Sequence, residues 1–211
     1  MIVHHFTTPI TTPFARKSTQ IYGDLRRLWE KAKIKESAKK PEITGLCRLI
    51  KGYKIMIKVL FVCHGNICRS PMAEFVMKDL VKKAGLASQF HIESAATSRE
   101  EIGNPVYSPA RRKLAEHGIS CDGHAALQLT NQDYDKYDLL IGMDSANLRN
   151  MHRICGGDSA GKLRLLMDYT DHPRDVADPW YTGDFEATWQ DVLAGCQGLL
   201  REITGHHHTR E

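Results

Sequence analysis

The sequence predicts an α/β fold: a three-layer sandwich in which helices cover both faces of a central parallel sheet of four strands. Two observations lead to this prediction. Short β-rich apolar runs alternate with segments of helical periodicity throughout the chain after residue 56. Strands separated by helices also require right-handed crossovers, which place the helices against the faces of a parallel sheet.

The strands and helices can be assigned in order along the chain. Strands are predicted over residues 58–62, 90–94, 138–143 and 162–167. Helices are predicted over residues 71–84, 109–117, 145–154 and 185–203. Pro71 suits the first position of a helix, and Gly118 is a typical residue just past a helix end. Ligands of such sheets bind beyond the carboxyl ends of the strands, and Cys63 lies at one of these ends.

The first 55 residues differ from the rest of the chain in charge. They hold 12 Lys/Arg and 4 Asp/Glu, so they are basic. Residues 56–211 hold 17 Lys/Arg and 21 Asp/Glu, so they are acidic. We therefore predict a basic extension over residues 1–55, a domain over 56–205 and a tail over 206–211. Residues 1–20 are Thr- and Pro-rich and are expected to be disordered, while 21–40 have the pattern of a basic amphipathic helix. Such a helix could bind a membrane surface or nucleic acid. We favour instead a solvated helix, or a protein that truly starts at Met56. We expect no nucleic-acid partner.

Composition excludes several classes of protein. No apolar run reaches the 18 or so residues of a membrane-spanning helix, and the first residues lack the pattern of a secretory signal. Six cysteines in 211 residues are too few for a disulfide scaffold, so we expect a reducing, cytoplasmic setting. No cysteine or histidine spacing suggests a metal site, and no cofactor is expected.

The residues best suited to chemistry lie in one stretch, from Cys63 to Pro71. A cysteine and an arginine, separated by five residues, connect a predicted strand to a helix start. Gly65 and Asn66 tolerate the left-handed conformation that turns successive backbone N–H groups inward. The helix N-terminus and Arg69 favour the thiolate of Cys63, and Arg69 can bind two oxygens of an oxyanion. The stretch predicts a nucleophile inside an anion-binding loop; a buried structural cysteine before a helix is the alternative.

This stretch, Val-Cys-His-Gly-Asn-Ile-Cys-Arg-Ser-Pro, resembles the signature loop of the low-molecular-weight protein tyrosine phosphatase family. Two further blocks resemble that family in the same order, Ser94-Ala-Ala-Thr-Ser98 with Ile102-Gly-Asn-Pro105, and Asp178-Pro-Trp-Tyr181. The resemblance spans residues 57 to about 203. It implies a sheet of flavodoxin-like topology, a phosphotyrosine protein or aryl phosphate as substrate, and a monomer or weak homodimer.

The resemblance also implies a role for each matched catalytic position. Cys63 would attack phosphorus and form a phosphocysteine, while Arg69 would stabilise the charge on the phosphoryl oxygens. Asp178 would protonate the leaving group and then act as base on a water molecule. Ser70 would donate a hydrogen bond to the thiolate.

Other residues are expected to bind substrate or to support the loop. Asn66, Ser94 and His117 match a hydrogen-bond network that would hold the strained asparagine. Asp144 would either orient Arg69 or cap the next helix. The expected substrate-binding residues are His64, Gly65, Asn66, Ile67, Cys68, Ser70, Trp180 and Tyr181.

A second cysteine in the loop suggests redox sensitivity. In the family that the chain resembles, the pair corresponding to Cys63 and Cys68 forms a reversible disulfide that protects the nucleophile from oxidant. A reactive thiolate beside a second thiol is the arrangement expected of such a switch. A small residue that only fills space is the alternative for Cys68.

Three positions depart from the family pattern, and a fourth bears on the choice of substrate. Glu100 stands where many relatives carry an aromatic residue, and His64 replaces a small or aliphatic one. The block His124-Ala-Ala-Leu-Gln128 resembles the family's His-x-Ala-Arg-Gln with Leu127 in place of arginine, so no role carries over there. Arginine phosphatases of this fold carry a small polar residue at the position of Ile67, so its bulk favours an aryl phosphate. We therefore predict a metal-independent protein tyrosine phosphatase; the alternatives are a protein-arginine phosphatase, an arsenate reductase, or a non-catalytic phosphate-binding or redox-sensing module.

Overall fold

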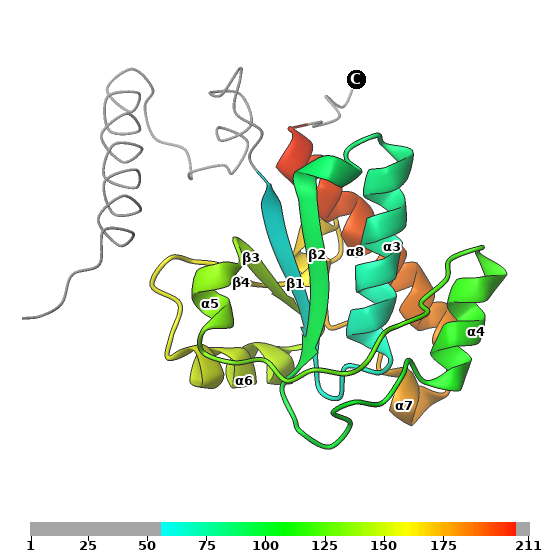
Figure 1. Ribbon diagram of the computed structural model, residues 1–211, viewed down its shortest axis with the longest axis horizontal. Helices are drawn as coiled ribbons and strands as arrows, with labels where there is room; N and C mark the ends of the chain where they lie inside the picture. The colour runs from blue at the N-terminus through cyan, green and yellow to red at the C-terminus, as the bar shows by residue number, and fades with distance from the viewer. Residues whose placement is uncertain (1–55, 206–211) are drawn as a thin grey trace, which may run out of the picture. The chain divides into compact units, whose positions relative to one another are not determined.

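The computed structural model describes residues 56–205 (Figure 1). The predicted basic extension over residues 1–55, with its amphipathic helix, and the predicted tail over 206–211 lie outside the described residues.

A parallel sheet of four strands forms the centre of this domain, as predicted. The strands are β1 (Ile57–Cys63), β2 (Phe90–Ala96), β3 (Leu139–Gly142) and β4 (Leu163–Leu165). Their order is β2-β1-β3-β4, so β1 is a central strand with a neighbour on each side. Cys63 pairs with Ala96 of β2, and Val62 pairs with Gly142 of β3, so these three strands end close together.

Helices cover both faces of the sheet (Figure 1). The helices of one layer are α3 (Arg69–Lys83), α4 (Ser108–Glu116) and α8 (Phe185–Thr204), and those of the other are α5 (Asp133–Lys136) and α6 (Ser145–Cys155). Three short helices complete the domain: η1 (Ala87–Gln89), η2 (Leu166–Tyr169) and α7 (Pro179–Thr182). No helix among residues 56–205 is long and apolar enough to cross a membrane.

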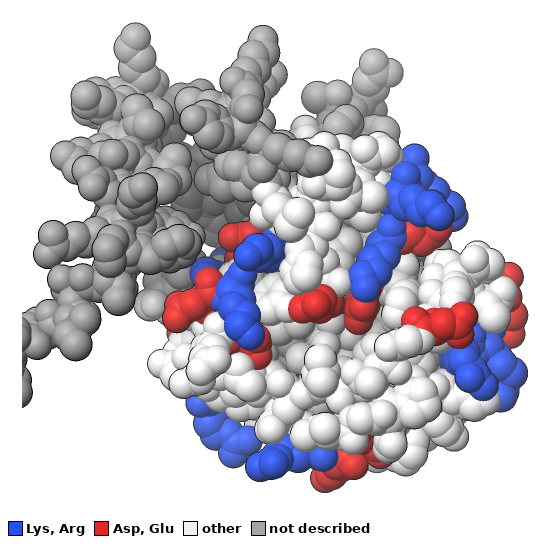
Figure 2. Space-filling view, in the orientation of Figure 1, with Lys and Arg blue, Asp and Glu red and all other residues white. Residues whose placement is uncertain are grey.

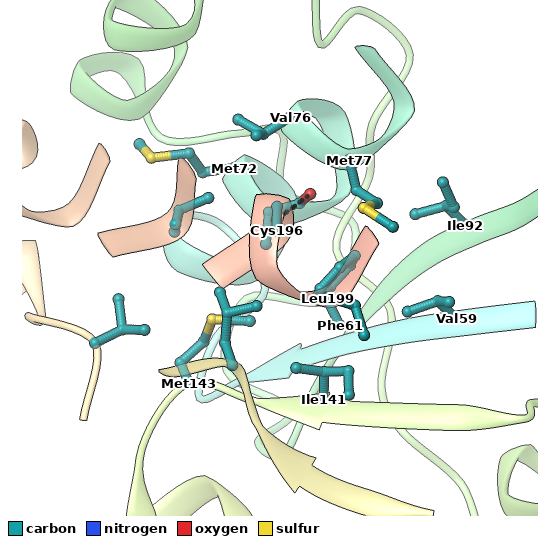
Figure 3. Packing of buried hydrophobic residues seen from close by; sticks show 14 of the residues in the cluster. Val59, Phe61, Met72, Val76, Met77, Ile92, Ile141, Met143, Cys196 and Leu199 are labelled. Carbon is teal, nitrogen blue, oxygen red and sulfur yellow. Dashed lines mark hydrogen bonds between the residues drawn. The ribbon is translucent and has the colours of Figure 1, made fainter. Parts of the chain in front are cut away.

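The alternation of side chains along β1 builds two hydrophobic clusters. Val59 and Phe61 point toward α3 and α8, where they pack with side chains such as Cys196 (Figure 3). Leu60 and Val62 pack on the opposite face of the sheet with the residues of α5 and α6. All four strand side chains are buried, as expected for a strand with helices on both faces.

The fourth strand is shorter than the sequence predicts. The prediction ran to residue 167, but β4 ends at Leu165 and a 3₁₀ turn follows. Packing against α8 explains the difference. Leu166 approaches Gly195 of that helix closely, and the backbone of Tyr169 approaches Gly198. A Cβ on Gly195 would lie 2.5 Å from Leu166 Cγ, so only glycine admits the turn there.

Candidate active site

The loop between β1 and α3 wraps around the sulfur of Cys63. Asn66 has a φ of 59°, and among residues 56–205 it is the one non-glycine residue with a positive φ. This conformation turns the backbone N–H of Asn66 toward Cys63 Sγ, to which it donates at 3.2 Å. Ser70 Oγ lies 3.0 Å from the same sulfur. Two polar groups of the loop therefore meet the cysteine, and both suit a negatively charged sulfur.

Hydrogen bonds of the Asn66 side chain hold its backbone in this conformation. Its Nδ2 donates to Ser70 Oγ at 2.9 Å and to Ser94 Oγ at 2.7 Å. Its Oδ1 accepts from the backbone N–H of Leu127 at 3.0 Å. The side chain is fully buried, so these bonds also satisfy polar atoms that water does not reach.

The network extends beyond the residues predicted from the sequence. Ser94 donates to the buried carboxylate of Glu74 at 2.5 Å, and His124 Nε2 lies 2.9 Å from the carbonyl oxygen of Asn66. His117, which was predicted for this network, stacks instead on Trp189 with ring centroids 3.8 Å apart. That prediction of position was wrong, because His117 caps the end of α4, whereas His124 lies on the loop that continues toward Asn66.

The guanidinium of Arg69 lies between two carboxylates. Its NH1 donates to Asp144 Oδ2 at 2.6 Å, and its NH2 lies 2.5 Å from Asp178 Oδ2. Asp144 also caps α6, because its Oδ1 accepts from the N–H of Asn147 at 2.6 Å; it fills both of the roles considered for it. Burial lowers the pKa of Arg69, but the charges of Cys63, Asp178 and Asp144 outweigh burial and raise it above its ordinary value.

Asp178 reaches this site from the segment that follows η2. It caps α7, and its Oδ1 accepts from the backbone N–H of Trp180 at 3.0 Å. Pro179 occupies the first position of the helix, where no N–H is needed. The other carboxylate oxygen is thereby left to face Arg69, so an acidic group stands beside the cysteine loop.

A pocket of about 210 Å³ lies at the carboxyl ends of the strands and joins these groups. This volume suits one side chain better than an extended ligand, since drug-sized pockets start at roughly 300 Å³. It is lined by the three predicted catalytic residues, Cys63, Arg69 and Asp178, and by Glu100 and Glu101. Six of the eight residues predicted to bind substrate also line it: His64, Gly65, Ile67, Cys68, Trp180 and Tyr181. The buried side chains of Asn66 and Ser70 lie behind the loop, where they support it.

The rim of the pocket is polar on one side and aromatic on the other. His64 Nε2 lies 3.0 Å from Glu100 Oε2, so two of the three departures from the family pattern contact each other. Trp180 and Tyr181 are 59% and 86% exposed. Tyr107, which the sequence prediction missed, packs against Trp180 with ring centroids 5.5 Å apart.

Cys68, the second cysteine of the loop, is buried. Burial, together with the charges of Cys63 and Asp178, raises the pKa of its thiol to about 12. Cys68 is therefore a neutral thiol near pH 7. Burial also raises the pKa of Cys121, of Cys155 (to about 11) and of Cys196.

Fold and site together define an α/β protein with a cysteine in the loop between a strand and a helix, beside a buried arginine. A family model described as low molecular weight phosphotyrosine protein phosphatase matches residues 58–208, and the chain belongs to that family. It is 42% identical over 150 residues to the low molecular weight protein-tyrosine-phosphatase YfkJ of Bacillus subtilis, across 70% of this chain and 96% of that protein.

Solved structures show the same likeness. The crystal structure of YfkJ has a TM-score of 0.70 at 40% identity and covers 75% of this chain and 100% of that one. The structure of the drosophila arginine phosphatase DARP has a TM-score of 0.64 at 28% identity and covers 74% of this chain and 100% of that one. The family expected from the sequence is confirmed.

Proposed function

We propose that the protein hydrolyses phosphotyrosine monoesters through a phosphocysteine intermediate. One observation carries this proposal: Cys63, Arg69 and Asp178 line a single pocket, in which the arginine lies 2.5 Å from the aspartate. A nucleophile, an anion-binding group and a proton donor are the three groups that such a displacement needs.

In the first step, Cys63 Sγ attacks phosphorus opposite the leaving oxygen. The S–P bond forms as the bond between phosphorus and the aryl oxygen breaks, and Asp178 transfers its proton to that oxygen. Arg69 and the loop N–H groups bind the equatorial phosphoryl oxygens as charge redistributes.

In the second step, water hydrolyses the phosphocysteine. Asp178, now a carboxylate, takes a proton from the attacking water, the new P–O bond forms and the S–P bond breaks. Phosphate leaves, and Cys63 returns to the thiolate. The 3.0 Å contact between Ser70 Oγ and Cys63 Sγ supports this step, since a hydroxyl that donates to sulfur stabilises the departing thiolate.

Attraction for the phosphoryl group is local to the loop. The face in Figure 2 carries positive and negative side chains side by side, and residues 56–211 hold more Asp/Glu than Lys/Arg. The buried guanidinium of Arg69 and the loop N–H groups therefore supply the affinity, because charges act more strongly away from water.

The walls of the pocket favour an aryl phosphate. Ile67 lines the pocket with a bulky apolar side chain, and Trp180 and Tyr181 can pack against an aromatic ring. Phosphoarginine is the second candidate, because the drosophila arginine phosphatase shares the fold. A non-catalytic phosphate-binding or redox-sensing module is the third, and the acid Asp178 beside Arg69 disfavours it. We place the protein in a reducing, cytoplasmic compartment, which the five free cysteines of the described residues support.

A phosphate-release assay tests the proposal on peptides that carry phosphotyrosine, phosphoserine or phosphoarginine. Wild-type protein should prefer phosphotyrosine, and Cys63→Ser should lose about 10⁴-fold or more of the rate, since the alcohol is a far weaker nucleophile than the thiolate. Cys121→Ser, which changes a buried cysteine outside the pocket, is the matched control and should retain turnover. Preference for phosphoarginine would refute the interpretation of Ile67, and no turnover of any peptide would refute catalysis.

A further inference from the structure

The segment that carries Asp178 is attached to α8 immediately before the aspartate. Ala177 precedes Asp178, and both polar groups of its backbone contact side chains of that helix. Its N–H donates to Asp191 Oδ2 at 3.1 Å, and its carbonyl oxygen accepts from Thr188 Oγ1 at 2.9 Å. Thr188 and Asp191 are three residues apart and therefore project from the same side of α8.

Both helix residues are buried, although neither contacts the pocket. Thr188 is fully buried and Asp191 is 4% exposed. A buried carboxylate is costly unless it is paired, and Asp191 is paired: Arg174 NH1 donates to its Oδ2 at 2.7 Å and NH2 contacts its Oδ1. Arg174 belongs to the same segment as Asp178, so one carboxylate holds this segment at two points.

The opposite side of the segment is tied to the end of the sheet. The N–H of Val176 donates to the carbonyl oxygen of Met143 at 2.8 Å, and Asp175 accepts from the N–H of Ser145 at 2.9 Å. Met143 and Ser145 flank Asp144, which contacts Arg69. Contacts from α8 and from the end of β3 therefore enclose the residues that lead into Asp178.

We propose that Asp191 and Thr188 are positioning residues that aim the carboxyl group of Asp178 at the leaving oxygen. This inference rests on the proposed function. With both polar groups of Ala177 held, little backbone freedom remains before Asp178, and the contact with the N–H of Trp180 restrains its side chain. Proton transfer depends steeply on distance, and a misplacement of about 1 Å can cost on the order of 100-fold in rate.

The experiment compares two substrates whose leaving groups differ in their need for a proton. Phenyl phosphate releases a basic phenolate that needs protonation, whereas 2,4-dinitrophenyl phosphate releases a stable anion that does not. The rate constant kcat/KM covers the step that releases the phenol. Asp191→Ala should lower it by about 10- to 100-fold for phenyl phosphate and by less than about threefold for 2,4-dinitrophenyl phosphate.

Conservative variants separate positioning from folding. Asp191→Asn keeps an oxygen that can accept from Ala177 and should recover part of the loss, and Thr188→Val removes only the hydroxyl from a buried side chain of the same shape. Thr188→Val should show the same selective loss, and it decides the question if Asp191→Ala does not fold. Inhibition by inorganic phosphate should stay within about twofold of wild type in every variant, because the binding loop is unchanged.

Asp158→Ala is the matched control, since Asp158 also organises a loop but contacts no residue of the acid-bearing segment. It accepts from the N–H groups of Lys162 and Leu163 and from the hydroxyl of Tyr134. It should leave the ratio of the two kcat/KM values unchanged. An equal loss on both substrates, or no loss, in Asp191→Ala and Thr188→Val would overturn the positioning role. Failure of the wild-type protein to turn over either substrate would instead refute the proposed function.

Discussion

The two halves of the site are built in opposite ways. The loop from Cys63 to Ser70 is part of the core, where Asn66 and Ser70 are fully buried and Arg69 is 3% exposed. The segment that carries Asp178 lies at the surface, and its aromatic residues extend into solvent (Trp180 59% exposed). The polar groups of the first half bond to one another and to many surrounding residues, such as Ser94 and Asp144, whereas the second half is attached by a few contacts to α8 and to the end of β3.

This difference indicates how stability and catalysis are distributed. A change in the buried loop leaves polar atoms without partners inside the protein, so it should reduce both the free energy of unfolding and turnover. After a change in the exposed segment, water can still hydrogen-bond to the polar atoms that lose a partner. Such a change should therefore reduce turnover with little effect on stability. Under the proposed mechanism, anion binding is preorganised within the core, while proton transfer depends on an attached surface segment.

Asp178→Asn should show the largest difference between the effect on turnover and the effect on stability. It removes the transferable proton, so kcat/KM for phenyl phosphate should fall by about 10²- to 10⁴-fold, while inhibition by inorganic phosphate persists. The unfolding temperature should stay within about 2 °C of wild type, because asparagine caps a helix as well as aspartate does.

The matched control is Asp184→Asn, which changes the exposed cap of α8. It should leave turnover within about twofold of wild type. If Asp178→Asn weakened phosphate binding as much as it slowed turnover, the proton-transfer role would be wrong. A large loss of stability would contradict the contrast between the two halves.

Asn66→Gly tests the buried half. Glycine accepts the left-handed backbone but loses three side-chain hydrogen bonds, so the free energy of unfolding in urea should fall by at least about 2 kcal/mol, together with turnover. Asn66→Ala should lose about 1–2 kcal/mol more, since the left-handed conformation is strained for alanine. The exposed Asn104→Ala should change stability by less than about 0.5 kcal/mol. Full stability in Asn66→Gly would show that the loop does not belong to the core.

The fold could be predicted because its signals are local in the chain. Apolar runs predicted all four strands, although the predicted ends differ from the observed ones by up to two residues. The early end of β4 depends on how Leu166 packs against Gly195 of a distant helix, which a local pattern does not reveal. The four-residue helices α5 and α7 were missed because they are too short to show a helical period.

The site was predictable where its residues share one motif and less so where distant segments meet. The stretch from Cys63 to Arg69 is one such motif, and the structure brings it together with Asp178. The supporting histidine was misassigned: two histidines flank one turn, and only folding places His124 near Asn66. The resemblance of its block to the family was a usable signal. Asp191 gave no comparable signal, because an acidic residue on a helix is ordinarily solvated.

The smallest expected effect concerns Cys68, the neutral thiol of the buried half. Peroxide should oxidise the thiolate of Cys63 to the sulfenic acid with release of hydroxide. The sulfur of Cys68 should then displace the hydroxyl group, which leaves with the thiol proton as water, to form a disulfide. After peroxide and then a thiol reductant, wild-type protein should regain a few-fold more of its own initial activity than Cys68→Ala. Cys196→Ala, a buried cysteine of α8, is the matched control and should recover as wild type does.

The pKa of Cys68 determines how this protection should change with pH. With that pKa near 12, the reactive thiolate fraction is small at neutral pH and rises about tenfold per pH unit below 12. Protection by Cys68, measured as the ratio of wild-type to Cys68→Ala recovery, should therefore increase from pH 6 to pH 8. A ratio of one at both pH values would mean that Cys68 only fills space. A ratio that falls with pH would mean that the neutral thiol does not limit disulfide formation.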